Sequence, residues 1–156
     1  TRAQVAAYKT LAPSFELAAA DVIDGTVTAA SIADWVMAQT GAPLVYSSAD
    51  PDVVRAAQAQ FGTTRAAHAI EMLFAALAAT LAQRGVTRIV VAGGETSGAV
   101  VSGLGAQTLE IGPRLAAGVP VVRVAGATPL CLALKSGNFG GPHFFAEALA
   151  RMETPT

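Results

Sequence analysis

Two short glycine-rich segments carry polar residues of the kind that bind a phosphorylated ligand. The members of the first segment are Gly93, Gly94, Glu95, Thr96, Ser97 and Gly98. Its glycines allow tight turns and let a ligand approach main-chain N–H groups, while Thr96 and Ser97 can cap a following helix. A helix N-terminus presents unpaired N–H donors and a partial positive charge, which suits a phosphate group. The segment therefore predicts an anion site, and a capped strand-to-helix turn without a ligand is the equal alternative.

Metal binding at this segment is expected only through Glu95. Its negative charge opposes an anion, so the carboxylate could hold a Mg²⁺ ion through water or bind the loop backbone instead. No direct metal ligands are predicted elsewhere, because His68 and His143 are each isolated and lack metal-ligand spacing. His68 is interpreted as a surface or packing residue, and His143 as a residue of a first helical turn.

The second segment begins with a lysine at the end of an apolar run, residues 130–134. Its members are Lys135, Ser136, Gly137, Asn138, Phe139, Gly140 and Gly141. A lysine beside a buried strand costs desolvation free energy unless an anionic group pairs with it, and the chain has only one other lysine, Lys9. Asn138 tolerates left-handed backbone geometry. The segment predicts a second part of the anion site, and the alternative is an exposed lysine head before a hairpin-like turn. Core packing is favoured over stacking on a nucleobase for Phe139.

A third polar segment precedes Pro51, and ligand binding is less strongly indicated for it than for the first two. It reads Ser47, Ser48, Ala49 and Asp50. These residues could bind phosphate or sugar hydroxyls, but a helix N-cap at Ser48 or Asp50 is favoured. The familiar phosphate-loop, dinucleotide and nucleophile-elbow motifs are all absent from the sequence.

The elements that must position these segments follow from periodicity and from glycine and proline signals. We expect helices over residues 2–11, 29–39, 51–61, 63–84, 96–104 and 142–152. We expect strands over residues 15–23, 44–46, 88–92, 108–111, 119–124 and 130–134. The pattern predicts a three-layer α/β/α sandwich with a mostly parallel or mixed central sheet, antiparallel near the C-terminus. Ligands bind beyond the carboxyl ends of such strands, so the two glycine-rich segments should meet there.

Composition narrows the classes of partner. The chain has 156 residues, of which 53% are apolar, which suits one domain with a sizeable core. A net charge of −1 gives no excess of positive charge to attract nucleic acid or an anionic membrane. Residues 66–82 are too few and too polar to span a bilayer. Cys131 is the only cysteine and is interpreted as a small buried hydrophobe, which suits a cytoplasmic protein.

Beyond these patterns, the sequence resembles a known family along nearly its whole length. The segments GGETSGAVVSGLG at 93–105 and LALKSGNFGGPHFFAEAL at 132–149 resemble the C-terminal nucleotide-binding domain of four-carbon acid sugar kinases. The segments TRAQVAAY, LVYSSAD and IGPRLAAGVPVV also occur in the family's order. The resemblance implies that residues 1–156 form one nucleotide-binding domain. The family's N-terminal substrate domain is absent from this chain, which opens directly into a helix and is expected to be a fragment.

The resemblance also implies a reaction and a division of roles. The family transfers phosphate from ATP to the terminal hydroxyl of a four-carbon acid such as a tetronate or 3-oxo-tetronate. The N-terminal domain is expected to bind the acid and supply the acidic residue that activates its hydroxyl, so the isolated domain should be inactive. The nucleotide contacts carried over are residues 93–98 and Gly137. Backbone N–H groups would hold phosphate oxygens, Thr96 or Ser97 would add a hydroxyl, and Lys135 would neutralise charge or anchor its loop.

Two departures and two alternatives stay open. His143 stands where relatives are expected to carry an acidic residue, and a serine-containing segment of the family's nucleotide site would lie just before Thr1. The domain could instead be a regulatory or assembly module that forms a homo-oligomer. It could also belong to an α/β enzyme whose loops hold the phosphate of a metabolite.

Overall fold

The computed structural model describes residues 1–47, 49–126 and 129–152. Its elements, in chain order, are α1 (Arg2–Lys9), β1 (Ser14–Leu17), α2 (Ala19–Ile23), α3 (Ala29–Ala38), β2 (Leu44–Ser47), α4 (Pro51–Phe61), α5 (Thr63–Gln83), β3 (Arg88–Ala92), α6 (Gly94–Gly103), β4 (Leu109–Ala116), β5 (Val119–Val124), β6 (Leu130–Lys135) and α7 (Phe144–Met152). Most of these elements coincide with the predicted ones to within two residues at each end.

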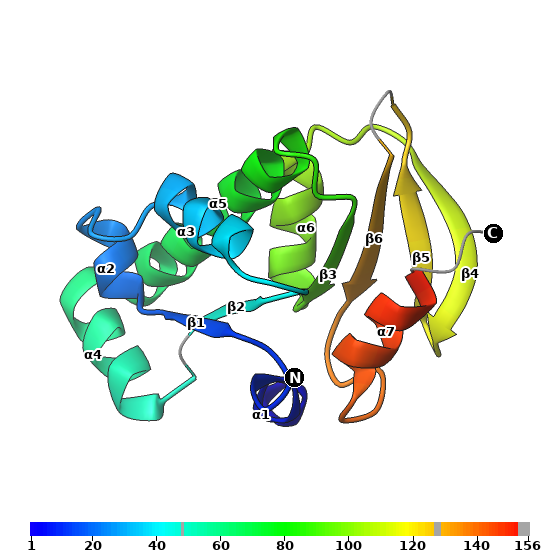
Figure 1. Ribbon diagram of the computed structural model, residues 1–156. Coiled ribbons are helices and arrows are strands. Elements are labelled where there is room, and N and C mark those ends of the chain that lie inside the picture. Colours follow the sequence, from blue (N-terminus) through cyan, green and yellow to red (C-terminus); the bar gives the residue numbers. More distant parts are fainter. Residues whose placement is uncertain (48, 127–128, 153–156) are drawn as a thin grey trace.

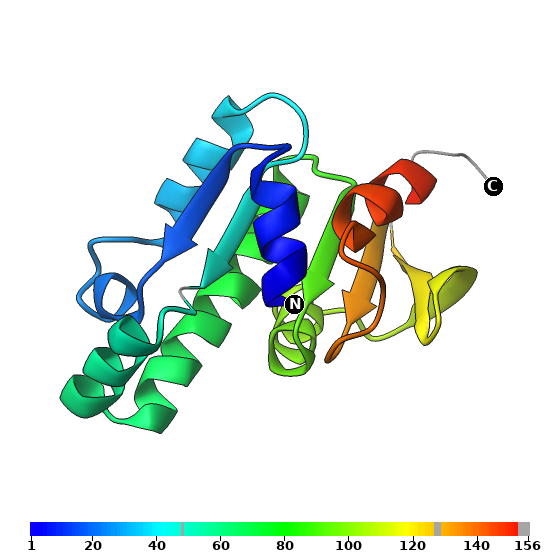
Figure 2. The ribbon, with the colours of Figure 1, turned by 90° about the horizontal axis from the view of Figure 1, so that it is seen from below.

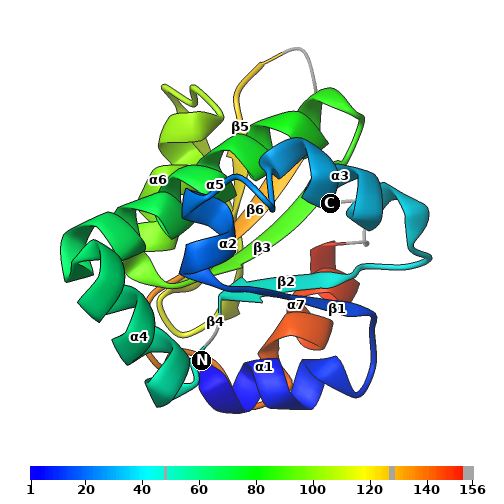
Figure 3. The same ribbon diagram turned by 90° about the vertical axis from the view of Figure 1, so that its left-hand side faces the viewer.

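The strands form two sheets rather than one. Strands β1 and β2 pair in parallel, and a second sheet has the order β3-β6-β5-β4. Within it β3 and β6 are parallel, whereas β6, β5 and β4 are antiparallel. Helices α2, α3, α5 and α6 cover one face of the strands, and α1 and α7 cover the other (Figures 1 and 3). The α/β fold and the mixed sheet are therefore confirmed, but β2 and β3 do not pair and the sheet is divided between them.

Apolar side chains on the inward faces of the helices form the core on both sides of the strands. On one face, Leu73, Leu77 and Leu81 of α5 pack with Leu17 and Ile32. On the other face, buried aromatic residues of α1 and α7 cluster over β5. Burial of both faces explains why β3 and β6 are almost wholly apolar, since parallel strands covered by helices have no solvent face.

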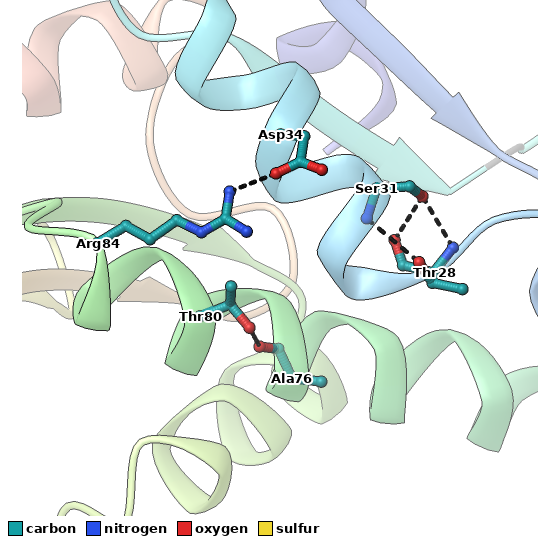
Figure 4. Close-up of polar contacts among 6 residues, drawn as sticks. All are labelled: Thr28, Ser31, Asp34, Ala76, Thr80 and Arg84. Carbon is teal, nitrogen blue, oxygen red and sulfur yellow. Dashed lines mark hydrogen bonds and ion pairs between the residues drawn. The ribbon is translucent and has the colours of Figure 1, made fainter.

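Helix α3 is fixed at its N-terminus and near its middle by polar contacts (Figure 4). At its N-terminus, Thr28 Oγ1 accepts from the Ser31 N–H at 3.2 Å, and Ser31 Oγ accepts from the Thr28 N–H at 3.0 Å. This reciprocal arrangement satisfies two backbone donors that the helix cannot pair internally. Further along, Arg84 Nη1 lies 2.7 Å from Asp34 Oδ1 and joins α3 to the end of α5.

The largest error in the predicted elements concerns residues 15–23, which are a strand only in their first part. The strand β1 ends at Leu17, and after the extended Ala18 the chain forms the short helix α2. Alanine-rich residues favour a helix, and α2 packs against α5. Strand β4 extends beyond the predicted 108–111 to Ala116, because antiparallel pairing with β5 continues past irregular register at Ile111 and Arg114. Pro113 is tolerated there, since β4 lies at the sheet edge.

Helix α5 is longer than the apolar segment identified in the sequence. Its 21 residues are enough, by length and composition alone, to cross a membrane, and it is the single such helix within the described ranges. The expectation concerned residues 66–82, which are too few to span a bilayer. The whole helix, Thr63–Gln83, is long enough by this criterion. Its contacts with α2, α3, α4 and α6 place it as the central helix of its layer.

Candidate functional site

The two glycine-rich segments meet at one edge of the larger sheet, as their positions after strands predicted. Strands β3 and β6 are parallel neighbours, with Ala92 opposite Lys135. The Gly93 N–H donates to the Lys135 carbonyl at 2.8 Å. A Cβ added at Gly94 would lie 3.6 Å from the Cβ of Ser136. Carboxyl ends of adjacent parallel strands thus bring residues about 40 positions apart into contact.

Helix α6 begins directly after β3 and turns its N-terminus toward the second segment. Gly93 is the residue before the helix, and its φ of 117° is one that other residues rarely adopt. The prediction that Thr96 or Ser97 caps α6 is wrong, because the helix starts at Gly94 and no side chain caps it. The N–H groups of Gly94, Glu95 and Thr96 have no carbonyl within the helix to bond, whereas the Ser97 N–H already donates to the Gly93 carbonyl at 2.9 Å. The three unpaired N–H groups therefore form a donor cluster suited to an anion.

Ser97 lies in this first turn and has a buried hydroxyl without a protein partner. Its Oγ is inaccessible to solvent and makes no hydrogen bond among the described residues. Most buried polar side-chain atoms in proteins are hydrogen-bonded, so an orphan of this kind needs a reason. A ligand oxygen at the helix N-terminus would supply the missing partner.

Lys135 is the most unusual residue of the site, because its side chain is completely buried. Its Nζ donates to the Gly137 carbonyl at 2.7 Å and to Thr1 Oγ1 at 3.2 Å. Both acceptors are uncharged, and the salt bridges within the described ranges do not include Lys135. Burial lowers the pKa of the Lys135 ammonium from its ordinary value of 10.5. The interpretation of an exposed lysine head is therefore wrong, and the site holds a buried cation without an anionic partner.

This lowered pKa predicts a pH dependence of stability. Between the folded and unfolded pKa values the unfolded chain binds more protons, so the contribution of Lys135 to stability rises as pH climbs toward 10.5. As the pH rises over this range, we expect the free energy of unfolding of wild type to increase relative to that of Lys135→Met. Urea unfolding at a series of pH values measures the difference. A constant or falling difference contradicts an uncompensated buried ammonium.

Other residues of the second segment depart from their predicted roles. Phe139 is 46% exposed, so core packing is wrong, and its ring lies against the position that a Cβ at Gly118 would take. The left-handed backbone falls on Gly137, with φ of 54°, and not on Asn138. Asn138 instead accepts a contact of 3.4 Å from the α-amino group of Thr1 through Oδ1. Ser136 is exposed beside Gly94.

Gln4 supports this loop and was missed by sequence reasoning. Its buried Nε2 donates to the carbonyls of Phe139, Gly140 and Gly141 at 3.0, 3.3 and 3.0 Å. The available signal was a polar residue beside Val5 and Tyr8 on the apolar face of the first helix. Gln4 fixes three consecutive carbonyls next to the predicted phosphate loop.

Glu95 and the histidines lie away from any cluster of metal ligands. Glu95 is exposed in the first turn of α6, and its predicted bond to the loop backbone is not among the contacts of the described chain. No group of three or more His, Cys, Asp or Glu residues forms a metal site in that part of the chain. His68 and His143 are both exposed. The donor set thus fits Mg²⁺ only in the way nucleotide sites commonly hold it, through phosphates and waters with few carboxylates.

The third polar segment has a structural role in the described residues. Asp50 Oδ1 accepts from the Asp52 N–H at 2.8 Å and caps α4, with Pro51 at its first position. This confirms the N-cap interpretation for Asp50. Ser48 lies outside the described residues. Cys131 in β6 is half-buried, not fully buried as predicted.

The chain is similar to a known domain family, to curated kinases and to solved structures. Residues 1–145 match a family model described as "Nucleotide-binding C-terminal domain". A 3-oxo-tetronate kinase of Brucella melitensis is 50% identical over 95% of this chain and 34% of its own length. A 3-oxo-tetronate kinase of Methylobacterium radiotolerans is 49% identical over 97% of this chain and 37% of its own. A crystal structure of a Haemophilus influenzae protein superposes with a TM-score of 0.87 at 42% identity, covering 96% of this chain and 37% of that one. The chain spans about a third of the length of these curated relatives.

Proposed function

The chain belongs to the nucleotide-binding C-terminal domains of the four-carbon acid sugar kinase family, and from this premise we propose that it binds the triphosphate of ATP between α6 and the β6–α7 loop. The observation that carries the proposal is the buried, uncompensated Lys135 beside an uncapped helix N-terminus. The Lys135 ammonium has no anionic partner among the described residues, and the helix N-terminus carries a partial positive charge. The two groups follow adjacent strand ends. A phosphate group placed between them would satisfy both at once.

Each residue of the site then has a defined task. The first-turn N–H groups of α6 and the Ser97 hydroxyl bind phosphate oxygens, and the Lys135 ammonium lies against the same group. Gly93 and Gly94 keep this region open, because a Cβ at Gly93 would lie 3.3 Å from Thr96 Oγ1 and one at Gly94 would lie 3.6 Å from the Cβ of Ser136. Bound Mg²⁺ would neutralise phosphate charge, with Glu95 reaching it through water. Phosphoryl transfer depends mainly on such positioning and charge neutralisation.

The proposed reaction of the whole protein is ATP-dependent phosphorylation of a four-carbon sugar acid, such as a 3-oxo-tetronate, at its terminal hydroxyl. The names of relatives that are 49% and 50% identical support this substrate class. A separate N-terminal domain would bind the acid and provide the group that activates its hydroxyl. Residues 1–156 would then bind nucleotide without turning it over. We place the protein in the cytoplasm, where ATP is available and a lone thiol stays reduced.

The Ser97→Ala variant tests the phosphate site without disturbing the fold. Removing a buried hydroxyl that has no partner leaves the free energy of unfolding unchanged or raises it. We expect the affinity for Mg-ATP, by calorimetric titration of the two-domain protein, to fall about five- to ten-fold, the value of roughly one hydrogen bond. Ser102→Ala, on the exposed part of the same helix, is the matched control and should bind as wild type.

Two outcomes of this titration would count against the proposal. Wild-type affinity in Ser97→Ala would remove the first turn of α6 from the nucleotide site. No binding of Mg-ATP by the folded two-domain protein would remove the whole assignment. Competition by a sugar phosphate but not by ATP would favour a phosphorylated metabolite as the ligand.

A further inference from the structure

The division of the sheet coincides with a large cavity. A space of about 990 Å³ lies between β2 and β3 and is lined by every residue of both strands. Helix α1 closes it on one face, where Figure 2 shows α1 crossing the interval between the two strands. Helix α5 closes it on the opposite face through Phe74, Leu77 and Leu81. The cavity therefore has a strand on each side and a helix on each face.

On the β3 side, backbone groups face this cavity without a strand to pair with. The Thr87 carbonyl accepts from Cys131 at 2.8 Å, and the Gly93 N–H donates to Lys135, so these odd-numbered positions point toward β6. Backbone groups alternate in direction along a strand. The N–H and C=O groups of Val90 and Ala92 consequently point away from β6 and into the cavity.

Backbone groups of β2 also face the cavity without a strand to pair with. The Leu44 N–H donates to the Pro13 carbonyl at 2.9 Å, which directs Leu44 and Tyr46 toward β1. By alternation, the backbone groups of Val45 and Ser47 point into the cavity. Two parallel edges thus present donors and acceptors to each other across an unfilled space. Unpaired backbone groups inside a helix-covered layer cost free energy, and native sheets pair or cover such edges.

The shape and chemistry of this space fit one more strand. Adjacent strands lie about 4.8 Å apart, so a strand between β2 and β3 would hydrogen-bond to both. About five extended residues, at roughly 3.3 Å each, match the length of β3. The wall formed by α5 is apolar, as it is over the buried strands of an α/β sheet, and α1 adds the apolar Val5 and Ala6 between Arg2 and Lys9. The occupant that fits is a short, apolar, extended peptide parallel to β3.

We propose that this peptide is the segment of the longer polypeptide that immediately precedes Thr1, inserted to give one continuous sheet with the order β1-β2-X-β3-β6-β5-β4. Thr1 lines the cavity and lies at the carboxyl ends of β2 and β3, beside Gly137 (Figure 2). A parallel strand ends at that edge, and α1 then returns along the face that it covers to reach β1. Relatives are about three times longer than this chain, and the family model describes a C-terminal domain.

The handedness of the resulting connection supports this assignment. From β1 to β2 the chain moves toward the cavity through helices on one face. From the inserted strand to β1 it would move in the opposite direction through α1 on the other face. Reversing both the direction and the face leaves the hand of a crossover unchanged. The inserted strand therefore obeys the same rule of crossover handedness as its neighbours.

Residue-resolved hydrogen exchange on the longer gene-encoded protein, without nucleotide, tests the proposal. We expect the amides of Val90, Ala92 and Val45 to exchange within about ten-fold of Ile89 and Val91, whose amides are protected by β6 and serve as internal controls. Exchange of Val90 and Ala92 more than 100-fold faster than the controls would show an open edge and overturn the proposal. The readout is independent of ATP binding, so failure of one proposal leaves the other standing.

A second variant identifies the occupant. Proline placed about four residues upstream of Thr1 removes a backbone donor from the inserted strand. We expect exchange of Val90 or Val45 to rise at least ten-fold while Val91 stays protected. Unchanged protection in this variant, or protection that disappears on dilution together with a dimer in light scattering, would assign the cavity to another segment or a second copy and overturn the assignment.

Discussion

Replacing Lys135 with methionine is expected to lower the affinity of the two-domain protein for Mg-ATP by about 10- to 100-fold. A hydrogen bond to a charged group contributes roughly 1.5–3 kcal/mol, and each 1.4 kcal/mol corresponds to a factor of ten in affinity. The upper end applies because the ammonium is fully buried and its two acceptors, at 2.7 and 3.2 Å, are uncharged. Methionine retains an unbranched chain that fills the same space. Calorimetric titration gives the change directly.

The chain offers a matched control, because it contains one other lysine. Lys9 is the last residue of α1, where it is exposed and its Nζ donates to the Tyr46 hydroxyl at 2.7 Å. Lys9→Met should bind Mg-ATP as wild type does. Equal affinity of both variants and wild type would mean that the phosphates are held without Lys135. In that case Lys135 would serve only to anchor the Gly137 carbonyl.

Replacing Gly103 with alanine is expected to lower the free energy of unfolding by about 3 kcal/mol, at the upper end of the usual cost of overpacking. A Cβ at Gly103 would lie 2.5 Å from the Ala75 carbonyl oxygen and 2.9 Å from its Cα. These are backbone atoms of α5, so no side-chain rotation can relieve the contact. Helices α5 and α6 would have to move apart. For a domain of this size the midpoint of thermal unfolding should fall by roughly 6–12 °C.

Gly98→Ala gives the opposite expectation within the same helix. No atom lies within 4 Å of a Cβ at Gly98, and alanine is favoured over glycine in a helix by about 0.5–1 kcal/mol. Its free energy of unfolding should therefore be unchanged or raised. Urea unfolding of the two variants separates close packing from helix propensity. A similar loss in both would show that α6 tolerates no substitution, whatever its contact with α5.

The sequence predicted most accurately the elements whose residues carry one strong signal. The β-branched runs Arg88–Ala92 and Val119–Val124 have the predicted bounds because no competing preference exists in them. Residues 15–23 mix strand and helix formers, and tertiary packing on α5 decided where β1 ends and α2 begins. The antiparallel extension of β4 depends on its partner β5, so its own residues could not reveal it.

The candidate site was predictable in location but not in detail. Parallel strands with polar residues at their carboxyl ends must bring those residues together, which placed Gly94 beside Ser136. The start of α6 at Gly94 reflects backbone geometry at Gly93, and it moved Ser97 from a capping role to a buried, unpartnered one. Gln4 escaped prediction because its partners are carbonyls 135–137 positions away.

The amide of Gln4 makes the first helix and the β6–α7 loop behave as one mechanical part. Its two hydrogens are shared among three successive carbonyls, so the loop from Phe139 to Gly141 follows any rotation of α1. Thr1, at the head of the same helix, contacts Lys135 and Gly137. The polypeptide ahead of α1 is therefore linked to the lysine and its loop through two residues of one helix end, so a displacement of α1 is expected to shift both.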